Sequence, residues 1–184
     1  MKLFSENIED LRTLYIAKLK KALDMEQKIT KALPTMIEKS TDIQLATAFR
    51  NHLTETQGHV AKVERLLRDA TGDASTTTCK AISSLITEAE DSIKDAADTS
   101  IRDITLIASA QEVEHHEMAV YGTLRNWAEL LGLTEAADTL ESILEEEKKA
   151  DELLTSISDS VNTSANIGTV GIKDTERRPY RTAV

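Results

Sequence analysis

The sequence predicts an all-α protein, a four-helix bundle of two antiparallel helix hairpins joined by a shorter crossover helix. Three observations predict this fold class. The chain of 184 residues contains only 6 glycines and 2 prolines, so residues that break helices are rare. Strand-like alternation is missing, and aromatic residues make up only 3% of the chain. Four amphipathic segments of roughly 27 to 33 residues and one shorter segment fit a bundle with a crossover.

The first hairpin is predicted from two segments separated by a short polar loop. Its first helix spans residues 8–39, and Pro34 is expected to kink or end that helix near its last turn. Thr41, with Gln44 three residues later, resembles a capping box that opens the second helix. The second helix is expected to end near Ala70, just before a glycine.

The crossover and the second hairpin follow. A shorter amphipathic segment over residues 79–97 is predicted to connect the two hairpins. Ser100 and Asp103 have the spacing of a helix cap, so the third long helix is expected to start there and to reach Leu131. The last helix is predicted over residues 134–161.

Charge and cysteine content exclude several classes of protein. With 22 basic and 32 acidic side chains, the net charge of -10 opposes binding to nucleic acid or an anionic membrane and favours cations. No segment has the roughly 20 apolar residues of a membrane span, and the start of the chain lacks a signal peptide. The single cysteine, Cys79, fits a reducing compartment. We therefore expect a cytoplasmic protein.

Each long helix carries acidic residues on or beside its apolar stripe near its midpoint. Including two histidines, these residues are Glu26, His52, Glu55, His59, Glu114, Glu117, Glu147 and Asp151. Antiparallel helices of similar length meet at their midpoints, so most of these side chains are expected at one level of the bundle. Several buried carboxylates repel one another unless protons or cations neutralise them. A pair of divalent ions would do so, and carboxylate with imidazole suits iron or manganese and also zinc.

Several short motifs along the chain match a known family. They are residues 25–27, 32–33, 52–56, 59–60, Cys79, 114–117, 121–124, 144–147 and Asp151. At these residues the sequence resembles the bacterial YciF-like stress-protein family of the ferritin-like superfamily. The match spans roughly residues 8–160. It implies a ferritin-like bundle with a di-iron or related metal site, and it implies no settled reaction.

The resemblance also implies metal ligands on all four long helices. In chain order they are Glu26; Glu55 as a bridging carboxylate with His59; Glu114 or Glu117; and Glu147 as a second bridge, with Asp151. Asp151 stands where ferritins place a histidine, which gives a site richer in carboxylate and leaves the metal's identity open. The contributions of three further residues also stay open: His52, Glu146 and His115.

The domain organisation predicted from these patterns is one ferritin-like bundle over residues 1–161 and a flexible C-terminal tail over residues 162–184. Within the tail, residues 167–172 faintly resemble the short peptides that load ferritin-like cargo into encapsulin shells. A flexible tail without such a partner is the default interpretation.

Two functions follow as hypotheses. In the first, a reduced di-iron centre reacts with oxygen or peroxide, or handles iron, during stress. The alternative is a non-catalytic structural or interaction protein, a helical dimer whose acidic layer is satisfied by lysine or water. A homodimer is the expected assembly in either case. A hydrolase is less well supported, because the sequence offers no catalytic triad spacing and no glycine-rich phosphate loop.

Overall fold

The computed structural model describes residues 8–170, with side chains up to residue 163, and contains no strand within that range. The helices in chain order are α1 (Leu11–Lys39), α2 (Ile43–Thr71), α3 (Lys80–Asp95), α4 (Thr99–Leu130) and α5 (Thr134–Val170). The predicted all-α fold class is therefore confirmed. None of the described helices is long and apolar enough to cross a membrane.

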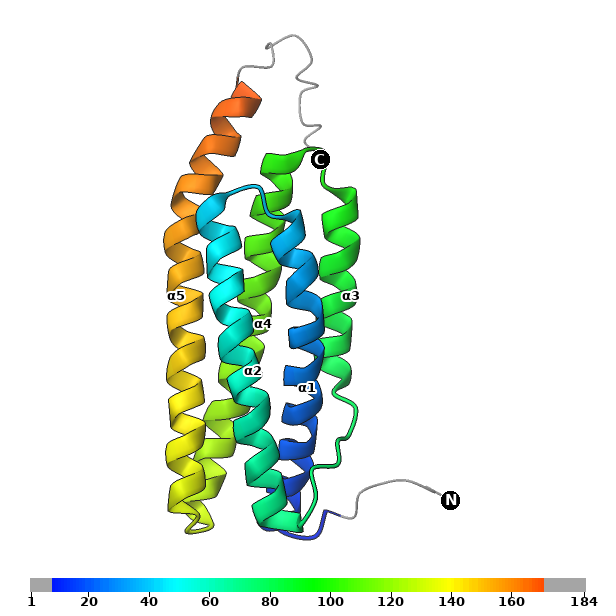
Figure 1. The fold of residues 1–184 in the computed structure, drawn as a ribbon, viewed down its shortest axis with the longest axis vertical. Helices are drawn as coiled ribbons and strands as arrows, with labels where there is room; N and C mark the ends of the chain where they lie inside the picture. The colour runs from blue at the N-terminus through cyan, green and yellow to red at the C-terminus, as the bar shows by residue number, and fades with distance from the viewer. Residues whose placement is uncertain (1–7, 171–184) are drawn as a thin grey trace, which may run out of the picture.

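The four long helices form two hairpins that pack side by side (Figure 1). Helix α1 packs against α2, and α4 packs against α5; the hairpins meet where α1 contacts α4 and α2 contacts α5. Helix α3 lies outside this bundle, against α1 and α4. It contributes one fully buried side chain, Ile82. The crossover helix predicted from the sequence is thus present, and it covers one side of the bundle.

Helices α1, α2 and α4 begin at other residues than predicted, and the N-cap of α2 is Asp42 and not Thr41. The N-cap of α1 is Asp10, whose side chain accepts a hydrogen bond of 2.7 Å from the backbone N–H of Thr13. The N-cap of α4 is Asp98, which accepts from the N–H of Ile101 at 2.9 Å. Because this aspartate provides the cap, the helix starts before Ser100 and includes it.

Asp103 was predicted as a cap partner within its own helix, and the structure gives it a different role. Its buried carboxylate accepts hydrogen bonds from the backbone N–H groups of Thr41 and Asp42, both at 2.9 Å, and from the Thr41 hydroxyl. Asp42 in turn caps α2 by accepting from the N–H groups of Gln44 and Leu45. The α1–α2 loop is therefore tied to α4, which fixes one hairpin against the other.

The first helix ends at Lys39 as predicted, with Pro34 inside it, whereas the predicted end of the last helix differs from the structure. Helix α5 continues past Val161 to Val170, through a stretch that contains no proline. The rest of the predicted tail, residues 171–184, lies outside the described residues. The side chains of residues 167–172, which faintly resemble encapsulin-loading peptides, lie outside them too.

Candidate metal centre

The four long helices bring six buried polar side chains together in the middle of the bundle. They are Glu26 from α1, His52 and His59 from α2, Glu114 and Glu117 from α4, and Glu147 from α5. Each interrupts the apolar stripe of its helix, and none is more than 7% exposed. Packing of the surrounding apolar residues therefore holds these groups away from water.

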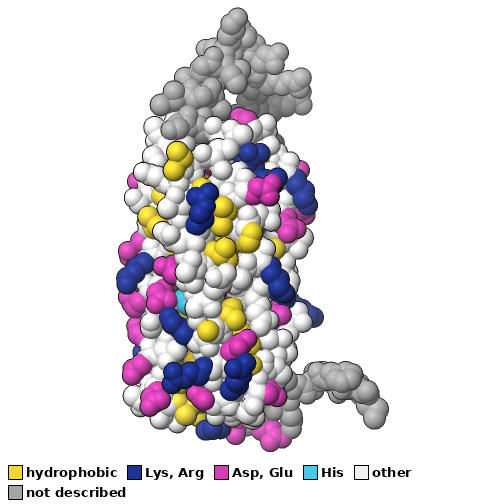
Figure 2. Space-filling model, viewed as in Figure 1, with side chains coloured by type: hydrophobic (Ala, Val, Ile, Leu, Met, Phe, Trp, Pro, Cys, Tyr) yellow, Lys and Arg dark blue, Asp and Glu magenta, His cyan; other side chains and the backbone are white. Residues whose placement is uncertain are grey.

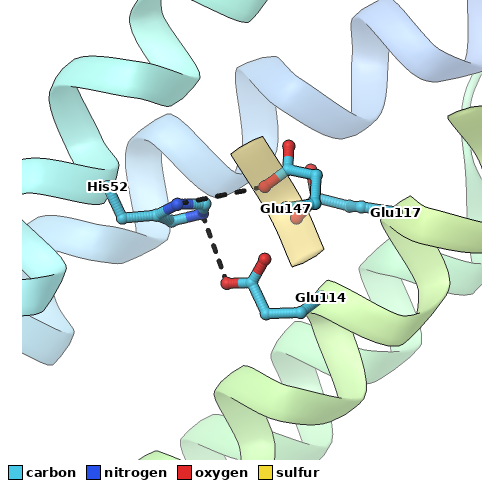
Figure 3. A group of neighbouring side chains, drawn as sticks. All are labelled: His52, Glu114, Glu117 and Glu147. Carbon is cyan, nitrogen blue, oxygen red and sulfur yellow. Dashed lines mark ion pairs between the residues drawn. The ribbon is translucent and has the colours of Figure 1, made fainter. Parts of the chain in front are cut away.

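These side chains form two clusters, and in each cluster one ligand atom from every residue lies within 4.8 Å of the others. The first, called the His52 cluster, consists of His52, Glu114, Glu117 and Glu147 (Figure 3). The second, called the His59 cluster, consists of Glu26, His59 and Glu147. The carboxylate of Glu147 belongs to both clusters and lies between the two histidines.

The two oxygens of Glu147 face different histidines. Its Oε1 lies 3.0 Å from Nδ1 of His59, and its Oε2 lies 4.0 Å from Nδ1 of His52. Each histidine also faces a second carboxylate. Nε2 of His52 is 3.4 Å from Oε1 of Glu114, and Nδ1 of His59 is 3.8 Å from Oε2 of Glu26. This is the arrangement of a carboxylate that bridges two neighbouring sites.

Many polar atoms of the two clusters are buried without a hydrogen-bond partner. They include Oε2 of Glu26, Nδ1 of both histidines, Oε2 of Glu114, and both oxygens of Glu117 and Glu147. Within residues 8–163, no lysine or arginine lies within 4.0 Å of these four carboxylates. Buried polar atoms without partners destabilise the folded protein. A bound cation that neutralises these carboxylates would remove that cost.

The electrostatics of the clusters reflect this shortage of positive charge. Burial raises the pKa of Glu26 to about 8, and it raises the pKa values of Glu114 and Glu117 well above the ordinary value, with neighbouring carboxylates adding to the effect. Burial alone would lower the pKa of His59, but the carboxylates of Glu147 and Glu26 outweigh it and raise that pKa to about 9. Without a cation, the clusters therefore retain protons at neutral pH.

Three residues around the His59 cluster hold its members in place. The buried hydroxyl of Tyr121 donates a hydrogen bond to Oε1 of Glu26, and the tyrosine ring lies edge-on to His59. Oε2 of Glu146 lies 2.6 Å from Nε2 of His59, and Lys62 donates to the same carboxylate at 3.0 and 3.2 Å. With its Nε2 engaged by a carboxylate, the imidazole presents Nδ1 to the cluster.

Comparison with known proteins identifies the family. A family model described as a domain of unknown function, DUF892, matches residues 10–166. Protein YciF of Escherichia coli (strain K12) is 35% identical over 161 residues, which cover 86% of this chain and 97% of that protein. The chain belongs to the YciF-like family.

Solved structures of YciF-like proteins share the fold. The E. coli stress protein YciF gives a TM-score of 0.80 at 33% identity, covering 84% of this chain and 98% of that one. YcfI from Rhodopseudomonas palustris gives a TM-score of 0.80 at 38% identity, with 83% and 98% covered. The membership predicted from the short motifs is thus confirmed across the bundle.

Five of the ligands that the YciF-like resemblance implied converge in the structure: Glu26, His59, Glu114, Glu117 and Glu147. Glu55, implied as a bridging carboxylate, lies outside both clusters, because its side chain is 49% exposed and faces Nδ1 of His52 at 3.7 Å. Thr56 takes the inward position on that turn of α2, fully buried, with its hydroxyl bonded to the carbonyl of His52. Glu147, by contrast, belongs to both clusters.

Asp151 also lies outside both clusters. Its carboxylate accepts a hydrogen bond from Nε2 of Gln111 at 3.3 Å and lies 3.5 Å from Nε2 of His115, an exposed histidine. Asp151 sits one turn beyond Glu147 on α5, and it pairs with the outer side of α4 there. His115 therefore supports the contact between α4 and α5 and does not face the centre.

The structure adds His52 to the residues that the sequence placed at the centre. His52 lies on the apolar stripe of α2, two turns before His59, which is about 10 Å along the helix. The sequence left the contribution of His52 to the site open. In the structure His52 belongs to one of two clusters, and Glu147 belongs to both. The signal in the sequence was the spacing of two inward histidines on one face.

Proposed function

We propose that this YciF-like protein holds two divalent metal ions, one in each cluster, and that Glu147 bridges them. The four carboxylates of the two clusters carry four negative charges when ionised, which two divalent ions neutralise. Oxygen and nitrogen donors without sulfur suit iron and manganese, and also zinc. Iron is the proposed metal, and reaction with oxygen or peroxide, or the handling of iron during stress, is the proposed function. The observation that carries the proposal is the set of buried, unpartnered ligand atoms around Glu147.

Different residues would hold each of the two ions. His52 with Glu114 and Glu117 would hold one ion, and Glu26 with His59 would hold the other. Bound ferrous ions would supply the electrons that reduce oxygen or peroxide. The stress-protein description belongs to the E. coli relative, and its similarity to this chain supports a role in the same setting.

Further contacts would prepare the second ion's site. Tyr121 orients one oxygen of Glu26 and leaves Oε2 for the cluster. Glu146 holds His59 so that Nδ1 faces inward, and Lys62 keeps Glu146 ionised and in place. These groups lower the cost of arranging the ligands when an ion binds.

The test is metal analysis of the full chain after anaerobic incubation with ferrous ion and desalting. We expect about two irons per chain, one per cluster. Glu147→Gln should lose most of this iron, because the amide cannot supply the shared charge. Glu145→Gln, which changes an exposed glutamate two residues earlier on the same helix, is the matched control and should bind like the wild type. A wild-type chain without iron, and without manganese or zinc when these are supplied, would refute the proposal.

The alternative of a purely structural helical dimer requires the acidic layer to be satisfied without metal. Lysine does not do this for the four clustered carboxylates: within residues 8–163 no lysine lies within 4.0 Å of them, and Lys62 pairs with Glu146 outside the clusters. Water molecules or bound protons would have to satisfy these four carboxylates instead. An unfolding midpoint that is identical with and without metal would favour this alternative.

A further inference from the structure

Two cavities approach the His52 cluster from different sides of the bundle. One, of about 50 Å³, lies among α1, α2, α3 and α4. The other, of about 230 Å³, lies mainly between α2 and α5. Phe49, His52 and Glu114 line both cavities, so the two spaces meet the cluster at the same side chains.

The smaller cavity, called the apolar pocket, lies beneath the crossover helix. Its walls are mainly aliphatic: Ile29, Leu33, Met36, Ile86, Ile93 and Val113. Its five polar residues differ in burial. Thr35 and Glu90 are exposed at the protein surface, Ser109 is half-buried, and His52 and Glu114 are buried in the cluster. The apolar pocket therefore leads from the surface to the candidate ligands.

The larger cavity, called the polar opening, has both apolar and charged walls. Asn51, Glu55, Glu146 and Lys149 line it together with the two shared cluster residues. Figure 2 shows histidine surface near the seam between α2 and α5, bordered by acidic and basic side chains. Water and hydrated cations can be held in such a space, because its polar side chains offer them hydrogen bonds.

We propose that the apolar pocket binds a small, uncharged, apolar molecule of the dioxygen class and brings it to the His52 cluster. Cations and hydrogen-bonding molecules such as peroxide would use the polar opening. Delivery of dioxygen to a metal rests on the proposed function. Binding of an apolar molecule in the pocket rests on the shape and walls of the pocket alone.

The chemistry of the walls separates the two candidate oxidants. Cavities lined by aliphatic side chains stay dry and accept apolar molecules, including xenon. Peroxide donates and accepts hydrogen bonds, and it would leave its partners in water to enter a space whose walls are mostly carbon. Dioxygen makes no such bonds of consequence in water and loses little on entry. A chain that used peroxide alone would have no use for an apolar pocket that ends at its ligands.

Xenon is the probe for this site, and it can be applied to the full chain without metal. We expect a saturable change in the ¹²⁹Xe chemical shift when xenon is titrated with the wild-type protein. Ala110→Leu should abolish it, because Ala110 is a buried wall residue and the larger side chain fills the pocket. Ala89→Leu on α3 is a second filling variant at a half-buried position, where misfolding is less of a risk.

The matched control is Ala48→Leu. Ala48 is buried to a similar degree, 8% exposed against 6% for Ala110, but it lines the polar opening and not the apolar pocket. This variant should keep the xenon response of the wild type, and circular dichroism should confirm that all variants fold. A wild type without saturable xenon binding would overturn the proposal. So would filling variants that fold and bind xenon as the wild type does.

Oxidation rates then test the delivery of oxygen. In iron-loaded protein, Ala110→Leu should slow oxidation by dioxygen and leave oxidation by peroxide unchanged. Equal slowing of both reactions, or of neither, would overturn delivery through the apolar pocket. A chain that binds xenon as expected but binds no metal would refute the proposed function and still support the gas site, so the two failures are distinguishable.

Discussion

The buried hydroxyl of Tyr121 on α4 donates a hydrogen bond to Oε1 of Glu26 on α1. The other oxygen of Glu26 faces Nδ1 of His59 on α2 at 3.8 Å. One carboxylate thus joins a tyrosine from one hairpin to a candidate ligand site in the other. Since Tyr121 and Glu26 are both fully buried, this contact stabilises the bundle whether or not a metal is bound.

Replacing Tyr121 with phenylalanine should destabilise the protein. The substitution keeps the ring but leaves Oε1 of Glu26 buried without its donor, which costs about 1 to 3 kcal/mol. Urea unfolding without metal measures the loss. Tyr15→Phe is the control, because Tyr15 is also buried but its pKa is raised by burial and not by a hydrogen bond to a carboxylate; its effect should be smaller. Equal effects would show that the Tyr121 hydroxyl is not an important partner.

Variants confined to one cluster should separate the two ions. Glu26→Gln removes charge from the His59 cluster, and Glu114→Gln removes it from the His52 cluster. Each variant should lose about half of the bound metal, because the other cluster keeps all of its residues, and elemental analysis after desalting measures it. The two variants would differ from Glu147→Gln, which changes both clusters. Complete loss of metal in either single-cluster variant would instead indicate one indivisible site.

Metal binding should raise the stability of the folded protein. An ion that binds only the folded state adds about 2.7 kcal/mol per site when its free concentration is a hundredfold above its dissociation constant. Manganese, which resists oxidation, is the practical probe, and guanidinium unfolding with and without it gives the change in midpoint. Glu147→Gln should show a much smaller rise. A rise of the same size in this variant would place the ion elsewhere.

Without metal, the stability should fall as the pH rises from about 5 to about 8. Burial raises the pKa of Glu26 to about 8 and that of Glu117 well above 4.5, so the folded protein holds these protons more tightly than the unfolded chain. The two carboxyl groups make their full contribution to the free energy of unfolding below about pH 4.5. That contribution is lost as the pH rises through their pKa values in the folded protein. His59, with its pKa raised from 6.5 to about 9 against the effect of burial, acts in the same direction.

Urea unfolding in a metal chelator across that pH range tests this expectation. Glu117→Gln carries a neutral amide where the folded protein prefers a protonated acid, so its stability should vary less with pH than that of the wild type. Stability that rises over the same range in the wild type would show that these carboxyl groups are ionised in the metal-free fold.

Asp103→Ala should be more costly than the loss of an ordinary helix cap. It leaves two backbone N–H groups and the Thr41 hydroxyl without their acceptor, for an expected loss of about 2 to 4 kcal/mol. Asp98→Ala removes a cap with a single hydrogen bond and should cost about 1 kcal/mol. Equal losses of unfolding free energy in the two variants would contradict the role of Asp103 in joining the hairpins.

The bundle could be predicted from the sequence because its long helices carry apolar stripes that only mutual packing can bury. The helix ends could not be predicted to the residue. Thr41 and Asp42 are both good cap residues, and the choice between them depends on Asp103, which lies about sixty positions away in the chain. Such a choice is made by tertiary contacts, which local patterns do not encode.

The same distinction holds for the candidate site. Glu26 and Glu147 lie within the stripes of their helices, and their positions there were enough to place them in the centre. Glu55 lies at the margin of its stripe, where a small rotation of α2 decides between core and solvent. His52 could be placed on the inner face of α2, but its part in a second cluster depended on where the shared carboxylate of Glu147 reaches.

The position of Glu147 between two histidines has a thermodynamic consequence. A carboxylate common to two sites makes the affinity of each site depend on whether the other is filled. With two ions bound as proposed, the first to arrive would fix the orientation of Glu147, which favours the second ion, whereas the positive charges of the two ions would oppose each other. The balance of these effects appears as cooperativity in a binding isotherm, and by reciprocity it has the same magnitude whichever cluster fills first.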